Sequence, residues 1–257
     1  MTLDERSDLR VGPRREGSGG HRRGRAARLL RRLVALGLGA VLLAVAAVGA
    51  AWPLTPSVAD ARQRIAARLA AHGAVDPGVL PVPDKVGTAI LATEDSRFRS
   101  HPGVDALGVL RAVVPLAGGA QDAGGATLDQ QLAKNLWTGD GGLLVKAEQV
   151  ELAFKLEALY SKDQILQMYL AEVYFGHGFY GLDAAARGYF GAAPSALTWP
   201  QASMLAGLVQ APSAFDPYLH LDLAKQRQRH VLDRLVATHA LTATQADQAF
   251  RAPLALG

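Results

Sequence analysis

The most extended apolar pattern is a run of 20 uncharged residues, Leu33–Trp52. As a helix it is about 30 Å long, which matches the hydrocarbon thickness of a bilayer. Two arginines stand directly before it. Because positive residues stay on the cytoplasmic side of a membrane, the pattern predicts a single-pass anchor with residues 1–32 in the cytoplasm and 53–257 outside.

A cleaved signal peptide is the alternative interpretation of this run. Small residues at 47–51 would suit a signal peptidase. The run is longer than the apolar core of about 7–15 residues that signal peptides have, which favours an uncleaved anchor. In both interpretations the rest of the chain lies outside the cytoplasm.

After the anchor, apolar residues recur mainly at helical spacing. The pattern predicts a helix from Ser57 to His72, with Ser57 as N-cap and Gly73 as its stop. A proline-rich connection covers 77–83, and a helix with an apolar face over 84–93 leads into Glu94.

Three later helices have predicted starts in which a hydroxyl and an amide satisfy free N–H groups reciprocally. These capping boxes are Ser161–Gln164, Thr198–Gln201 and Thr242–Gln245. Apolar spacing predicts a further helix near 222–239. Alternating β-branched runs are scarce, so we expect a mainly α protein.

Charge is distributed unevenly along the chain. Residues 1–32 hold ten arginines against four acids, whereas the remaining 225 residues hold 17 basic and 19 acidic side chains. The net charge of +4 therefore belongs to a tail, and a nucleic-acid-binding face is not indicated. The chain has no cysteine, which excludes disulfides, thiolate metal sites and cysteine nucleophiles.

Glu94 and Asp95 follow a mostly apolar stretch. An acid that emerges from apolar surroundings has a raised pKa, which suits proton transfer near neutral pH. The alternative is an acid pair in solvent at a helix end.

A second candidate segment covers residues 124–135. Its two glycines would let a backbone approach a ligand closely. Thr127, Gln131 and Lys134 fall at i, i+4 and i+7 and share one helix face, whose hydroxyl, amide and ammonium would suit a phosphate. A solvated polar face is the alternative.

The third segment, 174–181, places three glycines among aromatic residues, which indicates a tight loop. His177 lies in this loop. No second histidine stands at metal-ligand spacing, so we predict no metal site there.

Taken in order, these segments resemble the motifs of family 51 glycosyltransferases, the peptidoglycan polymerases. The resemblance covers about residues 80–251. It rests on E-D-S-R-F-R-S-H-P-G (94–103), G-G-A-T-L-D-Q-Q-L-A-K-N (124–135), S-K-D-Q-I-L-Q-M-Y-L-A-E-V-Y-F-G-H-G-F-Y-G (161–181), A-A-A-R-G-Y-F-G (184–191) and L-T-W-P-Q-A-S-M-L-A-G-L-V-Q-A-P-S (197–213).

The resemblance implies a lysozyme-like helical lobe with a small membrane-proximal jaw lobe, preceded by the transmembrane helix. Residues 104–123 would belong to the jaw; they are apolar enough to touch lipid, and a buried helix is the alternative. The predicted organisation is a tail at 1–32, an anchor at 33–52, a connector helix and linker at 53–83, and a glycosyltransferase domain at 84–251.

The implied reaction is the polymerisation of lipid II. Glu94 would take the proton of the acceptor 4-hydroxyl, and undecaprenyl diphosphate would leave the donor with inversion at C1. The resemblance assigns the remaining roles as substrate binding: Asp95, Phe98 and His101 around Glu94, and Thr127, Gln131, Lys134 and Lys146 at the diphosphate, with Gln149 beside them. It leaves room for a divalent cation, Mg²⁺ or Mn²⁺, at the diphosphate.

The sequence departs from the family pattern at several positions. By register from Ser161, Gln149 stands at the family's second glutamate and Val145 at an arginine. The other exchanges are Ala126 for serine, Asp129 for threonine and Ala171 for asparagine. The loss of one carboxylate and one cation would cost an order of 10²–10³ in rate.

These departures keep two alternatives open. One is a catalytically degenerate relative that binds lipid II or cell-wall synthesis partners. The other is a muramidase, because a single acid in a lysozyme-like lobe can protonate a glycosidic oxygen. The partners implied by the resemblance are lipid II, the nascent glycan strand, membrane lipid and cell-wall transpeptidases, at the plasma membrane.

Overall fold

The computed structural model describes residues 32, 35, 37, 39, 46, 49–78, 80–106 and 126–257. The chain divides into two compact units, Met1–Trp52 and Pro53–Gly257. The described positions of the first unit up to Ala51 are helical. Among the described residues, no helix has the length and apolar character needed to cross a bilayer. Most of the predicted anchor lies outside these residues, so the anchor stays a prediction.

The second unit is helical, and its described residues contain no β-strand. One isolated antiparallel bridge pairs Tyr174 with Tyr180. The predicted mainly α architecture is confirmed. The elements are α2 (Ala61–Ala71), α3 (Asp84–Glu94), the 3₁₀ turn η1 (Phe98–Ser100), α5 (Leu128–Ala133), the π-helical turn η3 (Lys134–Thr138), α6 (Leu143–Leu159), α7 (Lys162–Glu172), α8 (Leu182–Phe190), the 3₁₀ turn η4 (Pro194–Ala196), α9 (Trp199–Leu208), α10 (Leu221–Ala237) and α11 (Ala243–Arg251).

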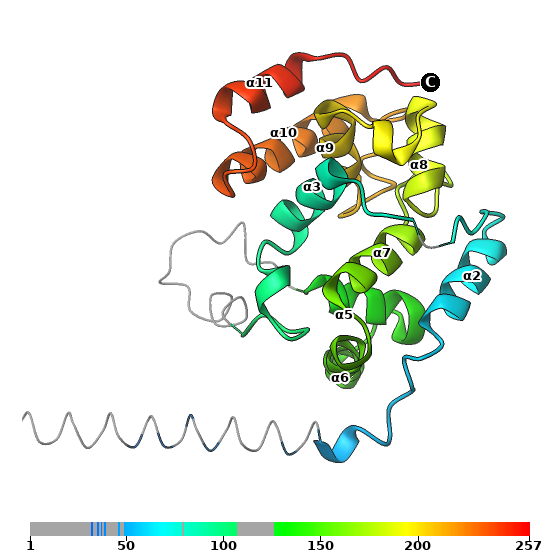
Figure 1. The fold of residues 1–257 in the computed structure, drawn as a ribbon, viewed down its shortest axis with the longest axis vertical. Coiled ribbons are helices and arrows are strands. Elements are labelled where there is room, and N and C mark those ends of the chain that lie inside the picture. The colour runs from blue at the N-terminus through cyan, green and yellow to red at the C-terminus, as the bar shows by residue number, and fades with distance from the viewer. Residues whose placement is uncertain are drawn as a thin grey trace, which may run out of the picture. The chain divides into compact units, whose positions relative to one another are not determined.

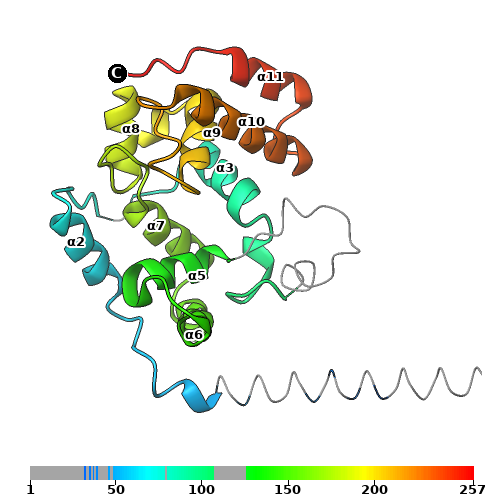
Figure 2. The same cartoon turned by 180° about the vertical axis from the view of Figure 1, so that it is seen from behind.

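The helices of this unit pack in two groups over one continuous apolar core (Figure 1). In the first, α9 packs against α10 and α3, and α11 against α10. In the second, α5 packs against α6, η3 and α7. Helix α2 lies along the second group, in contact with α7 and η3, as Figure 2 shows from behind. The position of α3 allows the side chain at its C-terminal end to meet residues of both groups.

All three predicted capping boxes are confirmed. Ser161, Thr198 and Thr242 each cap a helix start together with the glutamine three residues later. The predicted helix near 222–239 is α10. The predicted N-cap at Ser57 is wrong: its hydroxyl accepts from the N–H of Ala59 within a short turn, and α2 begins four residues later.

Of the predicted jaw segment 104–123, only residues 104–106 are among the described residues. The division into a lysozyme-like lobe and a jaw lobe therefore stays a prediction. Gly124 and Gly125 also lie outside the described residues.

Candidate active site

Glu94 is the last residue of α3. The helix forms because Val86, Ala89 and Ile90 place one apolar face in the core, where all three are fully buried. The helix ends at Asp95, whose backbone leaves the helical conformation with φ −155° and ψ 73°. The side chain of Glu94 keeps 13% of its surface exposed. It is a carboxylate at the edge of the core, as the apolar stretch before it predicts.

Two donors from different helices face the Glu94 carboxylate. Gln131 Nε2 on α5 donates to Oε2 at 3.3 Å, and Arg227 Nη2 on α10 lies 3.4 Å from Oε1. Burial raises the pKa of Glu94, the hydrogen bond from Gln131 and the charge of Arg227 lower it again, and Asp95 raises it. The net effect is a raised pKa, which suits a carboxylate that accepts a proton near neutral pH.

The side-chain amide of Gln131 is oriented by Tyr169 on α7. The hydroxyl of Tyr169 donates to Gln131 Oε1 at 2.9 Å. The amide nitrogen of Gln131 must then point toward Glu94, because its oxygen is already used as the acceptor. Burial, with Glu94 and Glu172 nearby, raises the pKa of Tyr169, so the phenol keeps its proton. Tyr169 is not among the site residues predicted from the sequence.

Arg227 is a second site residue that is not among those predicted from the sequence. It lies on the face of α10 that buries Ala224, Gln228 and Val231, and its own side chain is 13% exposed. Gly207 on α9 leaves room for it, because a Cβ there would be 3.1 Å from Arg227 Cγ. A charged residue within an apolar helix face is the sequence signal that points to such a site.

Asp95 and His101 form a buried pair next to Glu94. His101 Nε2 lies 2.9 and 3.0 Å from the two Asp95 oxygens, and its Nδ1 accepts from the N–H of Gly103. This pattern places a hydrogen on Nε2. Asp95 also accepts from the N–H of Leu128 at the start of α5. Phe98 is buried edge-on against the histidine ring. These residues join the end of α3 to the start of α5, and their predicted part in substrate binding stays a prediction.

Thr127 serves as the N-cap of α5. Its hydroxyl donates to the carbonyl of Gly103 at 2.6 Å and accepts from the N–H of Gln130. The side chain is buried, and Gln130 completes a capping box. These bonds give the Thr127 hydroxyl a structural role, and its predicted contact with a diphosphate stays a prediction.

Lys134 begins the π-helical turn three residues after Gln131. Three residues along a helix correspond to a rise of about 4.5 Å, so Lys134 belongs to the helix segment that reaches Glu94. Its ammonium pairs with Asp140 at 2.5 Å. Lys146 is exposed in the first turn of α6.

Gln149 on α6 contacts the end of the π-helical turn. Its amide nitrogen donates to Thr138 Oγ1 and to the carbonyl oxygen of Gly139, both at 3.0 Å. A carboxylate at this position has no hydrogen to donate to either oxygen. The amide of Gln149 therefore matches the two acceptor oxygens around it, and its predicted part in substrate binding stays a prediction.

Among the described residues, Asp95, His101 and Asp129 can each offer one ligand atom, and these atoms lie within 4.8 Å of one another. The first two already satisfy each other. The ammonium of Lys162 lies 3.9 Å from Asp129 Oδ2, and burial raises the pKa of Asp129, which also meets the Glu157 carboxyl. Burial and the neighbouring Glu157 favour the protonated form of Asp129, and we assign no metal to this cluster.

The loop at 174–181 uses its histidine structurally. His177 Nδ1 lies 2.9 Å from Asp216 Oδ2, and the ring of His177 packs edge-on against Tyr218. These contacts give His177 a structural role in the loop, and the absence of a metal site there stays a prediction.

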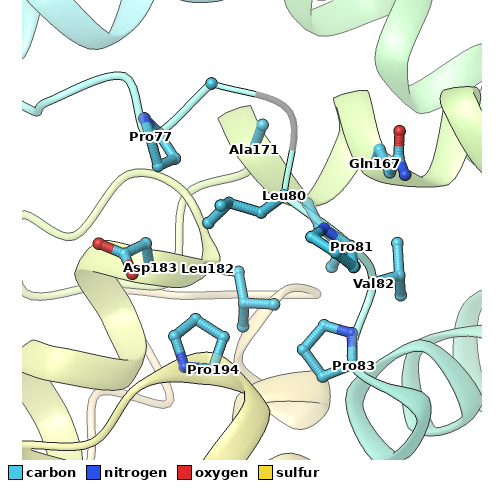
Figure 3. Close-up of a pocket in the computed structure, with 12 residues that line it drawn as sticks. Pro77, Leu80, Pro81, Val82, Pro83, Gln167, Ala171, Leu182, Asp183 and Pro194 are labelled. Atoms are coloured by element: carbon cyan, nitrogen blue, oxygen red, sulfur yellow. The ribbon is translucent and has the colours of Figure 1, made fainter.

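A small cavity lies between the proline-rich connection, α7 and α8 (Figure 3). The residues that line it include Leu80, Gln167, Leu182 and Ala171, and none of the predicted site residues. Ala171, one of the departures from the family pattern, therefore opens on this cavity, whereas Tyr169 on the same helix reaches Gln131.

The comparisons with known proteins point to one family. The protein-family model described as Transglycosylase matches residues 72–236. Penicillin-binding protein 1F of Bacillus subtilis is 46% identical over 154 residues, which are 59% of this chain and 21% of that protein. Penicillin-binding protein 1A of Escherichia coli is 41% identical over 169 residues, which are 65% of this chain and 20% of that protein.

A solved structure is also similar. The crystal structure of penicillin-binding protein 1A from Haemophilus influenzae covers 71% of this chain and 18% of its own, at 23% sequence identity and a TM-score of 0.44. The family match covers more than half of the chain, and the chain belongs to the transglycosylase family. It spans about a fifth of the length of the curated relatives it matches. The resemblance predicted from the motifs is confirmed.

Proposed function

We propose that the chain is a peptidoglycan glycosyltransferase that polymerises lipid II, with Glu94 as its catalytic base. The observation that carries this proposal is the position of Glu94. Its carboxylate is nearly buried, meets donors from α5 and α10, and lies beside the helix that continues into Lys134. Membership of the transglycosylase family supports the reaction class.

In this mechanism ionised Glu94 accepts the proton of the acceptor 4-hydroxyl as that oxygen bonds to C1 of the lipid-linked donor. The bond between C1 and the diphosphate oxygen breaks, the configuration at C1 inverts, and undecaprenyl diphosphate leaves. Burial keeps the carboxylate basic, while Gln131 and Arg227 stabilise its ionised form. Tyr169 holds the Gln131 amide in the orientation that this step needs.

The diphosphate would bind near Lys134 and Lys146, whose positive charges stabilise the leaving group. A divalent cation remains part of the proposal. Asp140, whose side chain is 89% exposed next to Lys134, would be its protein ligand, because Mg²⁺ is often held by one or two carboxylates together with substrate phosphates. Such an ion would neutralise phosphate charge.

The setting belongs to the same proposal. Residues 33–52 would anchor the chain in the plasma membrane, with the N-terminus in the cytoplasm and the catalytic unit outside, where lipid II and the nascent strand are found. Membrane lipid and cell-wall transpeptidases would be further partners.

A degenerate relative that binds lipid II without turnover is the second candidate. The specific observation in its favour is that Lys134 is already paired with Asp140 and that Gln149 is engaged with the π-helical turn. In this alternative neither side chain would be available for the leaving group.

The test is incubation of the purified full chain in detergent with labelled lipid II, beside Glu94→Gln. The proposal expects glycan strands from the wild type and none from the variant. Binding of lipid II without strands would support the degenerate relative instead. Release of muropeptides from purified sacculi would support a muramidase.

A further inference from the structure

Helix α2 precedes the matched residues 72–236, yet it packs against two elements that carry candidate site residues. It contacts η3 and α7. Two of its arginines, Arg64 and Arg68, stand four residues apart and so project from one face of the helix. Both reach the π-helical turn that begins with Lys134.

The π-helical turn needs partners for its backbone. The N–H of Gly139 bonds to the carbonyl of Lys134 at 2.7 Å, a spacing of five residues. The next two carbonyls accept from α2: Asn135 O from Arg68 Nη1 and Leu136 O from Arg64 Nη1, each at 3.3 Å. The two arginines therefore bind the peptide groups that directly follow Lys134.

Arg68 is itself fixed by a buried carboxylate. Its Nε lies 3.2 Å from Glu172 Oε2, and the Glu172 side chain is fully buried. The other oxygen of Glu172 accepts from Asn135 Nδ2 at 2.8 Å. Asn135 is thus held through its carbonyl by Arg68 and through its side chain by Glu172. The contact of Arg68 with Glu172 is an ion pair, and the contact of Asn135 with Glu172 is a hydrogen bond.

The opposite end of the turn is held from α6. Gln149 donates to Thr138 and to Gly139, as described above. Arg64 also lies over the ring of Trp137, with its guanidinium carbon 5.4 Å from the ring centroid. Contacts from α2 and α6 together define the conformation of the turn from which the Lys134 side chain projects.

We propose that Arg64 and Arg68 are positioning residues that hold the π-helical turn so that the ammonium of Lys134 meets the diphosphate of the lipid substrate. The inference rests on the proposed function for its substrate. It makes α2 a working part of the catalytic unit, in place of the connector helix that the sequence predicts.

The test uses the full chain with Arg64→Met, Arg68→Met and Arg68→Lys. Arg62→Met is the control, because Arg62 lies on the same helix and makes none of these contacts with the turn. We expect kcat/KM for lipid II to fall about tenfold in both methionine variants, mainly through KM, and to stay unchanged in the control. Arg68→Lys keeps a charge beside Glu172 but has no planar fork, so we expect it to stay impaired.

A double-mutant cycle separates positioning from general stability. If Arg68 acts through Lys134, Arg68→Met has little further effect on kcat/KM in a Lys134→Ala background. An equal loss in both backgrounds would overturn the proposal, as would rescue by Arg68→Lys. Arg64→Met leaves the Glu172 pair in place, so it serves as the test if Arg68→Met fails to fold.

A second readout is independent of activity. Reductive ¹³C-methylation labels the six lysines, and Lys134→Arg identifies the Lys134 resonance. The proposal expects this resonance to shift in Arg64→Met and Arg68→Met but not in Arg62→Met; an unchanged resonance would overturn it. A wild type without turnover would contradict the proposed function alone, because the resonance still reports on the turn.

Discussion

Two glutamates lie close to Tyr169, and burial raises the pKa of each carboxyl group. Glu172 is fully buried, with Asn135 Nδ2 at 2.8 Å and Arg68 Nε at 3.2 Å. Glu94 keeps 13% of its side chain exposed, and its two partners lie at 3.3 and 3.4 Å.

The difference indicates different roles for the two carboxyl groups. Glu172 is enclosed by short contacts to two side chains, so we infer that it holds Asn135 and Arg68 in place and leaves no surface for a substrate. Glu94 has weaker, longer contacts and some exposure, so a hydroxyl group can approach it. A raised pKa alone does not distinguish the two; accessibility does.

Replacement of each glutamate by glutamine should separate them most strongly. Glu94→Gln removes the proton acceptor, so we expect kcat to fall by about 10²–10⁴ with little change in Tm. Glu172→Gln keeps a buried polar group that Asn135 can accommodate by an amide flip, so we expect a change in kcat within about threefold. Polymerisation of lipid II and thermal unfolding of both variants are the measurements. The comparison would be reversed if Glu172→Gln lost activity and Glu94→Gln kept it.

The pH dependence of stability should depend on Glu172. Burial raises the pKa of Glu172 to about 7, against the opposing effects of Asn135 and Arg68. The folded state therefore favours the protonated carboxyl: this contribution is complete below pH 4.5 and is lost as pH rises through about 7. The loss is on the order of 3 kcal/mol of unfolding free energy.

Urea unfolding of wild type and Glu172→Gln across this range measures the effect. We expect the difference between the two proteins to shift in favour of the variant as pH rises from 4.5 to 7. Parallel pH profiles would show that Glu172 does not carry the dependence.

Tyr169→Phe should have a smaller effect on both stability and activity. It removes the hydroxyl that donates to Gln131 Oε1 and leaves a buried acceptor without that bond. We expect a loss of about 1–3 kcal/mol in stability and a several-fold fall in kcat, because Gln131 is no longer oriented toward Glu94. Chemical denaturation and lipid II turnover check it; a variant with unchanged turnover would remove Tyr169 from the site.

Gly207→Ala should give the smallest effect. The added Cβ would lie 3.1 Å from Arg227 Cγ, so the arginine must move by a few tenths of an ångström relative to Glu94. We expect kcat/KM to fall by about threefold or less. Gly142→Ala is the matched control, because a Cβ there meets nothing within 4 Å. Equal activity of the two variants would mean that the position of Arg227 does not matter.

Local features of this chain could be predicted from its sequence. The helix starts at Ser161, Thr198 and Thr242 depend on contacts between residues three apart, so the local pattern contains the necessary information. The partly buried position of Glu94 could be predicted for a similar reason, since the apolar face of α3 leads directly to it.

The remaining features depend on contacts across long stretches of chain. Arg227 reaches Glu94 across 133 positions, and Arg68 reaches Asn135 across 67. No spacing rule connects such residues, so the site role of Arg227 and the docking of α2 could not be predicted. The wrong prediction of an N-cap at Ser57 has the same cause. Lys155 donates to the carbonyls of residues 55 and 56, Tyr160 contacts those of residues 58 and 59, and these bonds hold the segment outside the helix.

The most direct test of the account is the pH dependence of kcat/KM for lipid II in wild type and Arg227→Gln. A base must be ionised to act, so the account predicts a rate that rises with pH through the pKa of Glu94. It also predicts that the rise of kcat/KM occurs at higher pH in the variant, because the charge of Arg227 lowers the pKa of Glu94. A rise of kcat/KM at the same pH in both proteins would contradict the assignment of Glu94 as the base.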